Sequence, residues 1–107
     1  MATFQQIGDE VKRGLLQLLA QEGQAAVQAA LSDGAAFLQD TRADLERWTR
    51  LLAAGQLTKD DFASLIRGRQ DLAAMAGLKH AGFTAIRIEQ IKTSLIQLVI
   101  TAAGRVV

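Results

Sequence analysis

Three aspartates have the spacing best suited to chemistry in this chain. Asp33, Asp40 and Asp44 are seven and four residues apart, which places their carboxylates along one stripe of an α-helix. Paired carboxylates can carry out acid–base catalysis or bind cations. Arg47 follows Asp44 by three residues, however, so a solvated or ion-paired face is the interpretation we favour.

His80 is the only histidine, and the chain has no Cys. Positions 76, 77, 83 and 84, one helical turn away from His80, are Ala, Gly, Phe and Thr, so no second metal ligand lies beside it. We interpret His80 as a cation in a last helical turn or as a packing residue, with a general base as the minority alternative. Disulfides, thiolate catalysis and Cys-based zinc sites are excluded.

The segment "IRGRQD", Ile66 to Asp71, places two arginines around a glycine without a Gly-rich phosphate loop. Arg69 falls on the apolar stripe of its predicted helix, which favours an ion pair with the first half of the chain. Ser32, Ser64 and Ser94 have no candidate base at helical spacing. The sequence therefore predicts that the protein is not an enzyme. We expect no catalytic, cofactor-binding or metal-binding residue, and no cofactor.

Length and charge restrict the remaining possibilities. The 107 residues correspond to one domain, 1–107, and half of them are hydrophobic. The net charge of +1 gives no global bias towards nucleic acid or an anionic membrane. Residues 1–54 carry seven acids and five bases (−2), whereas residues 55–107 carry four acids and seven bases (+3). Two arms packed on each other would show this difference, and so would chance in a small sample.

The sequence has no clear membrane-spanning segment. The longest weakly charged run, Thr93 to Val107, is shorter than the ~20 residues that a spanning helix needs. Polar residues interrupt any signal-peptide core near the N-terminus. Together with the lack of Cys, these features favour a cytoplasmic location. The chain stops at "GRVV" without a helix stop signal, so a longer parent protein remains open.

The first half of the chain shows two helical patterns that differ in phase. Polar residues recur every three or four positions and apolar residues lie opposite them, and this spacing continues through Gly14 and Gly23. It predicts one helix over 3–31. Each glycine costs roughly 1 kcal/mol relative to Ala unless a close packing contact compensates. A heptad repeat of leucines follows at positions 31, 38, 45 and 52. The change of phase predicts a kink or break at 32–34 and a second helix over 34–54.

The stretch "LLAAGQLTKDDFASL", Leu51 to Leu65, carries several helix-end signals that agree with one another. Gly55 suits the left-handed position after a helix, and Thr58 suits the N-cap of the next one. Asp61 is placed as in a capping box, and Leu57 and Phe62 occupy the positions of a hydrophobic staple. The sequence therefore predicts a central αα-hairpin with its turn at 54–58.

Residues 45–66 resemble the helical hairpin of SHOCT-like domains. The shared pattern is a pair of leucines, a glycine, an apolar residue, Thr, acidic residues and Phe. In this chain these positions are Leu51, Leu52, Gly55, Leu57, Thr58, Asp60, Asp61 and Phe62. The resemblance implies an oligomerisation or tethering role without chemistry.

The second half of the chain predicts helices over 59–80 and 83–106, which are either separate or continuous. The last helix has an apolar set that suits a core and a second apolar set on an adjacent face. The second set is Ile86, Ile96, Ile100, Ala103 and Val107. Together the two sets cover about 220° of the helix surface, more than the ≳100° of an ordinary surface helix. We therefore take the second set as a candidate interface.

These patterns predict an all-α protein that forms a helical bundle or an antiparallel coiled coil. The expected function is a non-enzymatic module that self-associates or binds a helical protein partner through its C-terminal helix. The alternative is binding to a lipid or other hydrophobic surface through amphipathic helices at 1–31 and 83–107. Nucleic-acid binding is not expected, because the basic residues are scattered and no aromatic residues lie between them.

Overall fold

The computed structural model describes residues 3–105, and their regular secondary structure is entirely helical. The predicted all-α class is therefore confirmed. The elements are α1 (Phe4–Leu18), α2 (Gln24–Asp40), α3 (Arg42–Ala53), α4 (Lys59–Arg67), a 3₁₀ turn η1 (Gln70–Leu72), α5 (Ala76–His80) and α6 (Ala85–Arg105).

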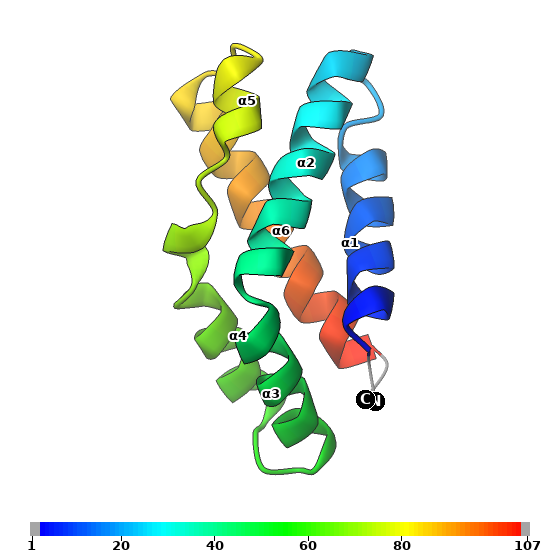
Figure 1. The fold of residues 1–107 in the computed structure, drawn as a ribbon, viewed down its shortest axis with the longest axis vertical. Coiled ribbons are helices and arrows are strands. Elements are labelled where there is room, and N and C mark those ends of the chain that lie inside the picture. Colours follow the sequence, from blue (N-terminus) through cyan, green and yellow to red (C-terminus); the bar gives the residue numbers. More distant parts are fainter. Residues whose placement is uncertain (1–2, 106–107) are drawn as a thin grey trace.

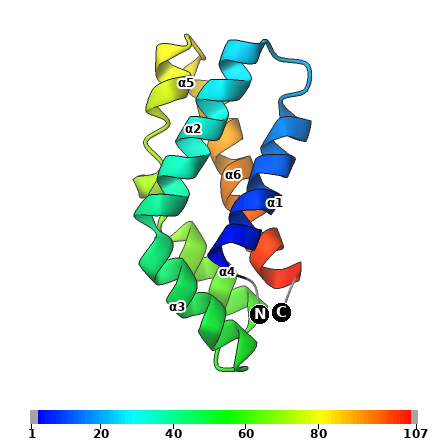
Figure 2. The same ribbon diagram turned by 45° about the vertical axis from the view of Figure 1, so that its right-hand side comes forward.

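The helices form a bundle that closes within one chain (Figure 1). Helix α1 runs to one end of the molecule, and α2 and α3 return to the other end. After the hairpin turn, α4, η1 and α5 run back, and α6 crosses behind α2 to end beside the start of α1. Helix α6 packs against α1, α4 and α5, while α2 lies between α1 and α5 (Figure 2). The result is an elongated body of 42 × 22 × 19 Å.

The first arm breaks in a different place from the predicted one. Helix α1 ends at Leu18, and Gly23 is the N-cap of α2. Residues 32–34, where we predicted the break, lie inside α2. The chain reverses direction at 19–23, so the two apolar stripes face one core from opposite sides. One straight helix could not turn both apolar stripes towards the same core. The phase of the apolar pattern therefore changes where the chain reverses.

The heptad stripe faces the core, although it is divided between two helices. Leu38, Leu45 and Leu52 are buried, and α2 gives way to α3 at Thr41. Thr41 is itself buried, and its hydroxyl donates a hydrogen bond of 2.9 Å to the carbonyl of Phe37. This bond back into the preceding turn satisfies the hydroxyl where the helix is interrupted.

The hairpin turn has the predicted caps. Gly55 has a φ of +75°, and the amides of Gly55 and Gln56 bond to the carbonyls of Leu52 and Leu51. This is the Schellman arrangement that ends a helix. Thr58 accepts a hydrogen bond from the Asp61 amide at 3.0 Å, and the Asp61 carboxylate accepts one from the Thr58 amide at 3.2 Å. Both halves of the capping box are therefore present.

The predicted helix over 59–80 is wrong. Helix α4 ends at Arg67, and only η1 and the five residues of α5 follow before Ala81. The apolar residues of this arm contact different helices along its length. Helix α4 packs on α3 and α6, whereas α5 packs on α2 and α6. Helix α5 ends at a second glycine with positive φ, Gly82, so it is not continuous with α6.

The core lies along α6. Ile91, Leu95 and Val99 of α6 are fully buried, as are Val11 and Leu15 of α1. Phe37 of α2 and Phe62 of α4 are among the fully buried residues that the other helices contribute. A central position for α6 explains why its apolar surface is wider than one partner helix requires.

Candidate functional site

The three aspartates of the predicted stripe have separate roles. The two carboxylate oxygens of Asp33 accept hydrogen bonds from the backbone amides of Gly77 at 2.8 Å and Leu78 at 2.9 Å. Asp33 on α2 thus caps the first turn of α5, 44 residues later in the chain. Asp40 is exposed at the end of α2. The stripe is therefore not a group of converging carboxylates.

Asp44 is the centre of a small ion-pair cluster. It bonds to the guanidinium groups of Arg47 and Arg69, each at 2.8 Å. The same two guanidinium groups lie 5.8 and 5.6 Å from the centre of the Trp48 ring. The predicted pairing of Arg69 with the first arm is confirmed. All four residues hold α3 against the end of α4, which gives the cluster a structural role.

His80 is exposed in the last turn of α5. Within residues 3–105, no group of three or more His, Asp or Glu side chains is arranged to hold a metal ion. The buried hydroxyl groups of Thr41 and Thr49 donate hydrogen bonds to backbone carbonyls of their own helices. These polar groups therefore stabilise the fold, and the surface hollows are the better candidates for function.

The structure corrects the predicted interface on α6. Ile96 and Ala103 are buried within the chain, and Ile100 is half-buried. Ile86 is 75% exposed, while Val107 lies outside the described residues. The second apolar set suggested an exposed surface because the sequence does not show that several helices of the same chain surround α6.

A groove between α1 and α6 has an apolar surface and is lined by uncharged residues. Its volume is about 470 Å³, and none of its described lining residues is charged. They are Gly14, Gln17, Leu18, Ser94, Gln97, Leu98 and Thr101. Leu18 on its rim is 39% exposed. We call this hollow the α1–α6 groove.

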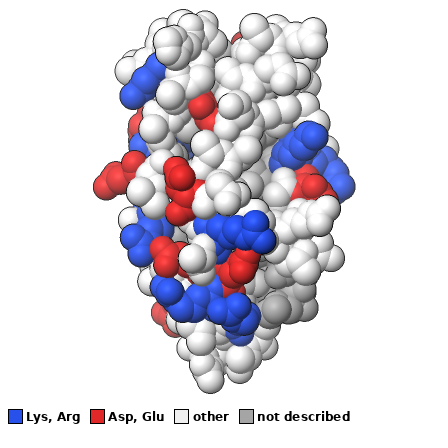
Figure 3. All heavy atoms as spheres, in the orientation of Figure 1, with Lys and Arg blue, Asp and Glu red and all other residues white. Residues whose placement is uncertain are grey.

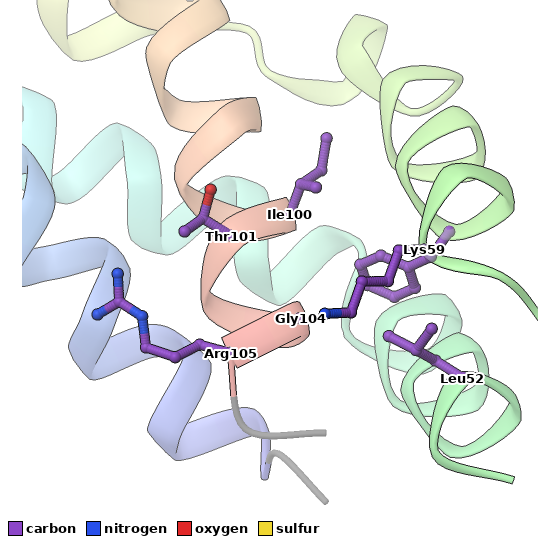
Figure 4. Close-up of a pocket in the computed structure, with 7 residues that line it drawn as sticks. Leu52, Lys59, Ile100, Thr101, Gly104 and Arg105 are labelled. Carbon is purple, nitrogen blue, oxygen red and sulfur yellow. The ribbon is translucent and has the colours of Figure 1, made fainter. Parts of the chain in front are cut away.

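A second groove lies where the hairpin turn meets the end of α6, and we call it the Lys59 groove. Its volume is about 390 Å³. Leu52, Lys59, Phe62, Ile100, Thr101, Gly104 and Arg105 line it (Figure 4). Two further hollows lie between α1 and α2 and between residues 73–75, α5 and α6.

Charged side chains are unevenly spread over the surface. On the face shown in Figure 3 most of them lie over the middle and lower parts of the molecule, with a further group at its right-hand edge. Few charged side chains lie near either end of the bundle on this face, the tip at the hairpin turn included. Between Gly14 and Ser32 the sequence has one charged residue, Glu22, which pairs with Arg87 at 3.2 Å. The end of α1 and the start of α2 thus carry little charge, and the end of α1 forms the α1 side of the α1–α6 groove.

The sequence patterns did not identify either groove. Leu18 is 39% exposed and Leu98 is half-buried against the core. Their partial exposure depends on the separation of α1 and α6, which spacing along the chain does not reveal. Gly14 was the available signal, because a glycine inside a helix needs a close packing contact to compensate its cost.

Comparisons with known proteins identify no relative. No protein-family model, curated protein or solved structure matches the chain. A search of the described helices for a long apolar segment found none able to cross a membrane.

Proposed function

We propose that this protein is a non-enzymatic helical module that self-associates through the α1–α6 groove. The observation that carries the proposal is the uncharged lining of that groove, with Leu18 partly exposed on its rim. Charged residues are depleted at the centre of protein–protein interfaces, and polar uncharged residues at the rim can exchange hydrogen bonds with a partner. The groove has both features.

A second copy of the chain is the occupant that the geometry favours. In a two-fold interface the same patch occurs on both partners, so a ridge must lie beside a groove that accepts it. Leu18 provides the ridge, and Leu98, which packs closely on Gly14, lies in the wall of the adjacent groove. The net charge of +1 opposes association only weakly. A standard interface needs about 800 Å² per partner, about an eighth of the 6102 Å² surface.

Sedimentation equilibrium with two matched variants tests the proposal. The wild type should give the mass of a dimer at micromolar concentrations. Leu18→Glu should shift the protein to a monomer, because it places a charge in an uncharged contact. Leu16→Glu is the control, since Leu16 is 42% exposed on the same helix but does not line the groove. A monomeric wild type, or equal effects of the two variants, would contradict the proposal.

The alternative of lipid-surface binding requires a large rearrangement. The apolar faces of α1 and α6 that would enter a membrane are packed in the shared core. Co-sedimentation of the wild type with neutral and anionic vesicles distinguishes the two functions. Binding to vesicles accompanied by loss of the α1–α6 contact would favour the lipid-surface function.

The resemblance of residues 45–66 to SHOCT-like hairpins agrees with a role in assembly without chemistry. It supports the proposal through architecture alone, because no residue of the hairpin lines the α1–α6 groove. In this proposal the hairpin shapes the bundle, and α1 and α6 make the contact.

A further inference from the structure

The Lys59 groove combines an apolar lining with an open wall. Leu52 and Phe62 are buried residues that line it, and Ile100 contributes a half-buried side chain. At Gly104 the wall has no side chain, and among residues 3–105 no atom would lie within 4 Å of a Cβ atom built there. The groove therefore has room for an apolar chain that lies against these side chains.

The charge of this groove is positive. Lys59 extends towards Gly104, and its amine lies beside the ribbon there (Figure 4). Arg105 points instead towards α1, where it pairs with Glu10 at 3.1 Å. No Asp or Glu is among the described lining residues, and none of the ion pairs within residues 3–105 involves Lys59. One cation thus faces an apolar groove without a carboxylate partner in this part of the chain.

We propose that the Lys59 groove binds a medium-chain fatty acid, with the carboxylate on the Lys59 amine and the alkyl chain on Leu52, Phe62 and Ile100. A volume of about 390 Å³ lies in the range of small-molecule sites, which are mostly apolar with a few placed polar groups. A phosphate ligand would need more donors than the groove offers. The Asp61 and Phe62 amides at the start of α4 already bond to Thr58.

This site is distinct from the proposed self-association surface. Thr101 lines both grooves, but Lys59 and Gly104 line the Lys59 groove alone. Variants at these two positions therefore test ligand binding separately from self-association.

Calorimetric titration of the full chain with decanoate, below the concentration at which decanoate forms micelles, tests the proposal. The wild type should bind one decanoate per chain with saturation. Lys59→Gln should weaken binding about fivefold, the size of effect expected for an exposed ion pair, and Lys59→Arg should restore it. Lys79→Gln is the control, because it removes the same charge from α5 at the other end of the bundle.

Two further arms test the chemistry and the place of binding. Decyltrimethylammonium carries the same alkyl chain with the opposite charge and should bind more weakly than decanoate. Gly104→Leu should abolish decanoate binding, since its side chain would occupy the groove, while circular dichroism confirms that the helices remain. Amide shifts on titration should centre on Thr101 and Gly104.

The proposal is overturned by any of three results. These are no saturable binding of decanoate, equal binding of decanoate and decyltrimethylammonium, or equal effects of Lys59→Gln and Lys79→Gln. If Gly104→Leu does not fold, the two lysine variants and the two ligands still decide the question.

Discussion

Asp33 shows how far a single side chain can be interpreted from the sequence. We predicted a break in the first arm at 32–34, but Asp33 lies inside α2 and caps a helix elsewhere in the chain. The helix that it caps is α5, which no local pattern around Asp33 could identify. The bond to Gly77 also requires close approach, because a Cβ atom at position 77 would lie 2.9 Å from an Asp33 oxygen.

We predict that Asp33→Ala lowers the free energy of unfolding by about 2 kcal/mol. The substitution leaves two backbone amides of α5 without their charged acceptor, and caps of this kind contribute about 0.5–2 kcal/mol. Urea denaturation measures the loss, and hydrogen exchange should show faster exchange in α5. Asp40→Ala, on the same helix, removes an exposed carboxylate and should change stability by less than about 0.5 kcal/mol. Equal losses in the two variants would refute a specific cap.

Two glycines of α1 show what the packing of helices adds to local propensity. Gly8 and Gly14 both lie inside α1, where each costs roughly 1 kcal/mol relative to Ala. A Cβ atom at Gly8 would touch only a Leu38 methyl group, at 4.0 Å. A Cβ atom at Gly14 would lie 3.1 Å from Leu98 Cγ and closer still to its methyl groups. Leu98 would have to move to accept it.

We predict opposite effects for the two alanine variants. Gly8→Ala should raise the free energy of unfolding by up to about 1 kcal/mol, because the helix gains propensity without a clash. Gly14→Ala should lower it, because displacing Leu98 at the α1–α6 contact costs more than the gain in propensity. Thermal denaturation followed by circular dichroism measures both. A rise in stability for Gly14→Ala would show that α1 and α6 are less tightly packed than the structure indicates.

The sequence predicted those helices and turns whose signals are local. The hairpin turn at 54–58 was predictable because Gly55, Thr58 and Asp61 act on backbone groups within a few residues. The break at 19–23 and the division of 59–80 were not, because they depend on which helices the apolar residues contact. The same limit explains the candidate interface. Ile96 and Ala103 have the spacing of an exposed stripe and are buried only because α6 is central.

The shape of the whole bundle determines where function can lie. The apolar faces of α1 and α6 are used by the core, and the charged cluster around Asp44 fixes the hairpin arm. Between Gly14 and Gln21 the chain has no charged residue, whereas Lys59 brings a positive charge to the Lys59 groove. We therefore propose assembly at the α1–α6 groove and ligand binding at the Lys59 groove.

The location of the contact between two copies tests the central claim most directly. The chain has no Cys, so a spin label on Gln97→Cys occupies one position, on the edge of the α1–α6 groove. Spin-labelled chains that carry no isotope label are mixed with isotope-labelled wild type. Broadening of amide signals in the wild type then reports the contact. We predict broadening at Gly14, Leu18 and Ser94, with the amides of α4 unaffected. Broadening centred on α3 and α4, or none at concentrations that populate the dimer, would contradict the account.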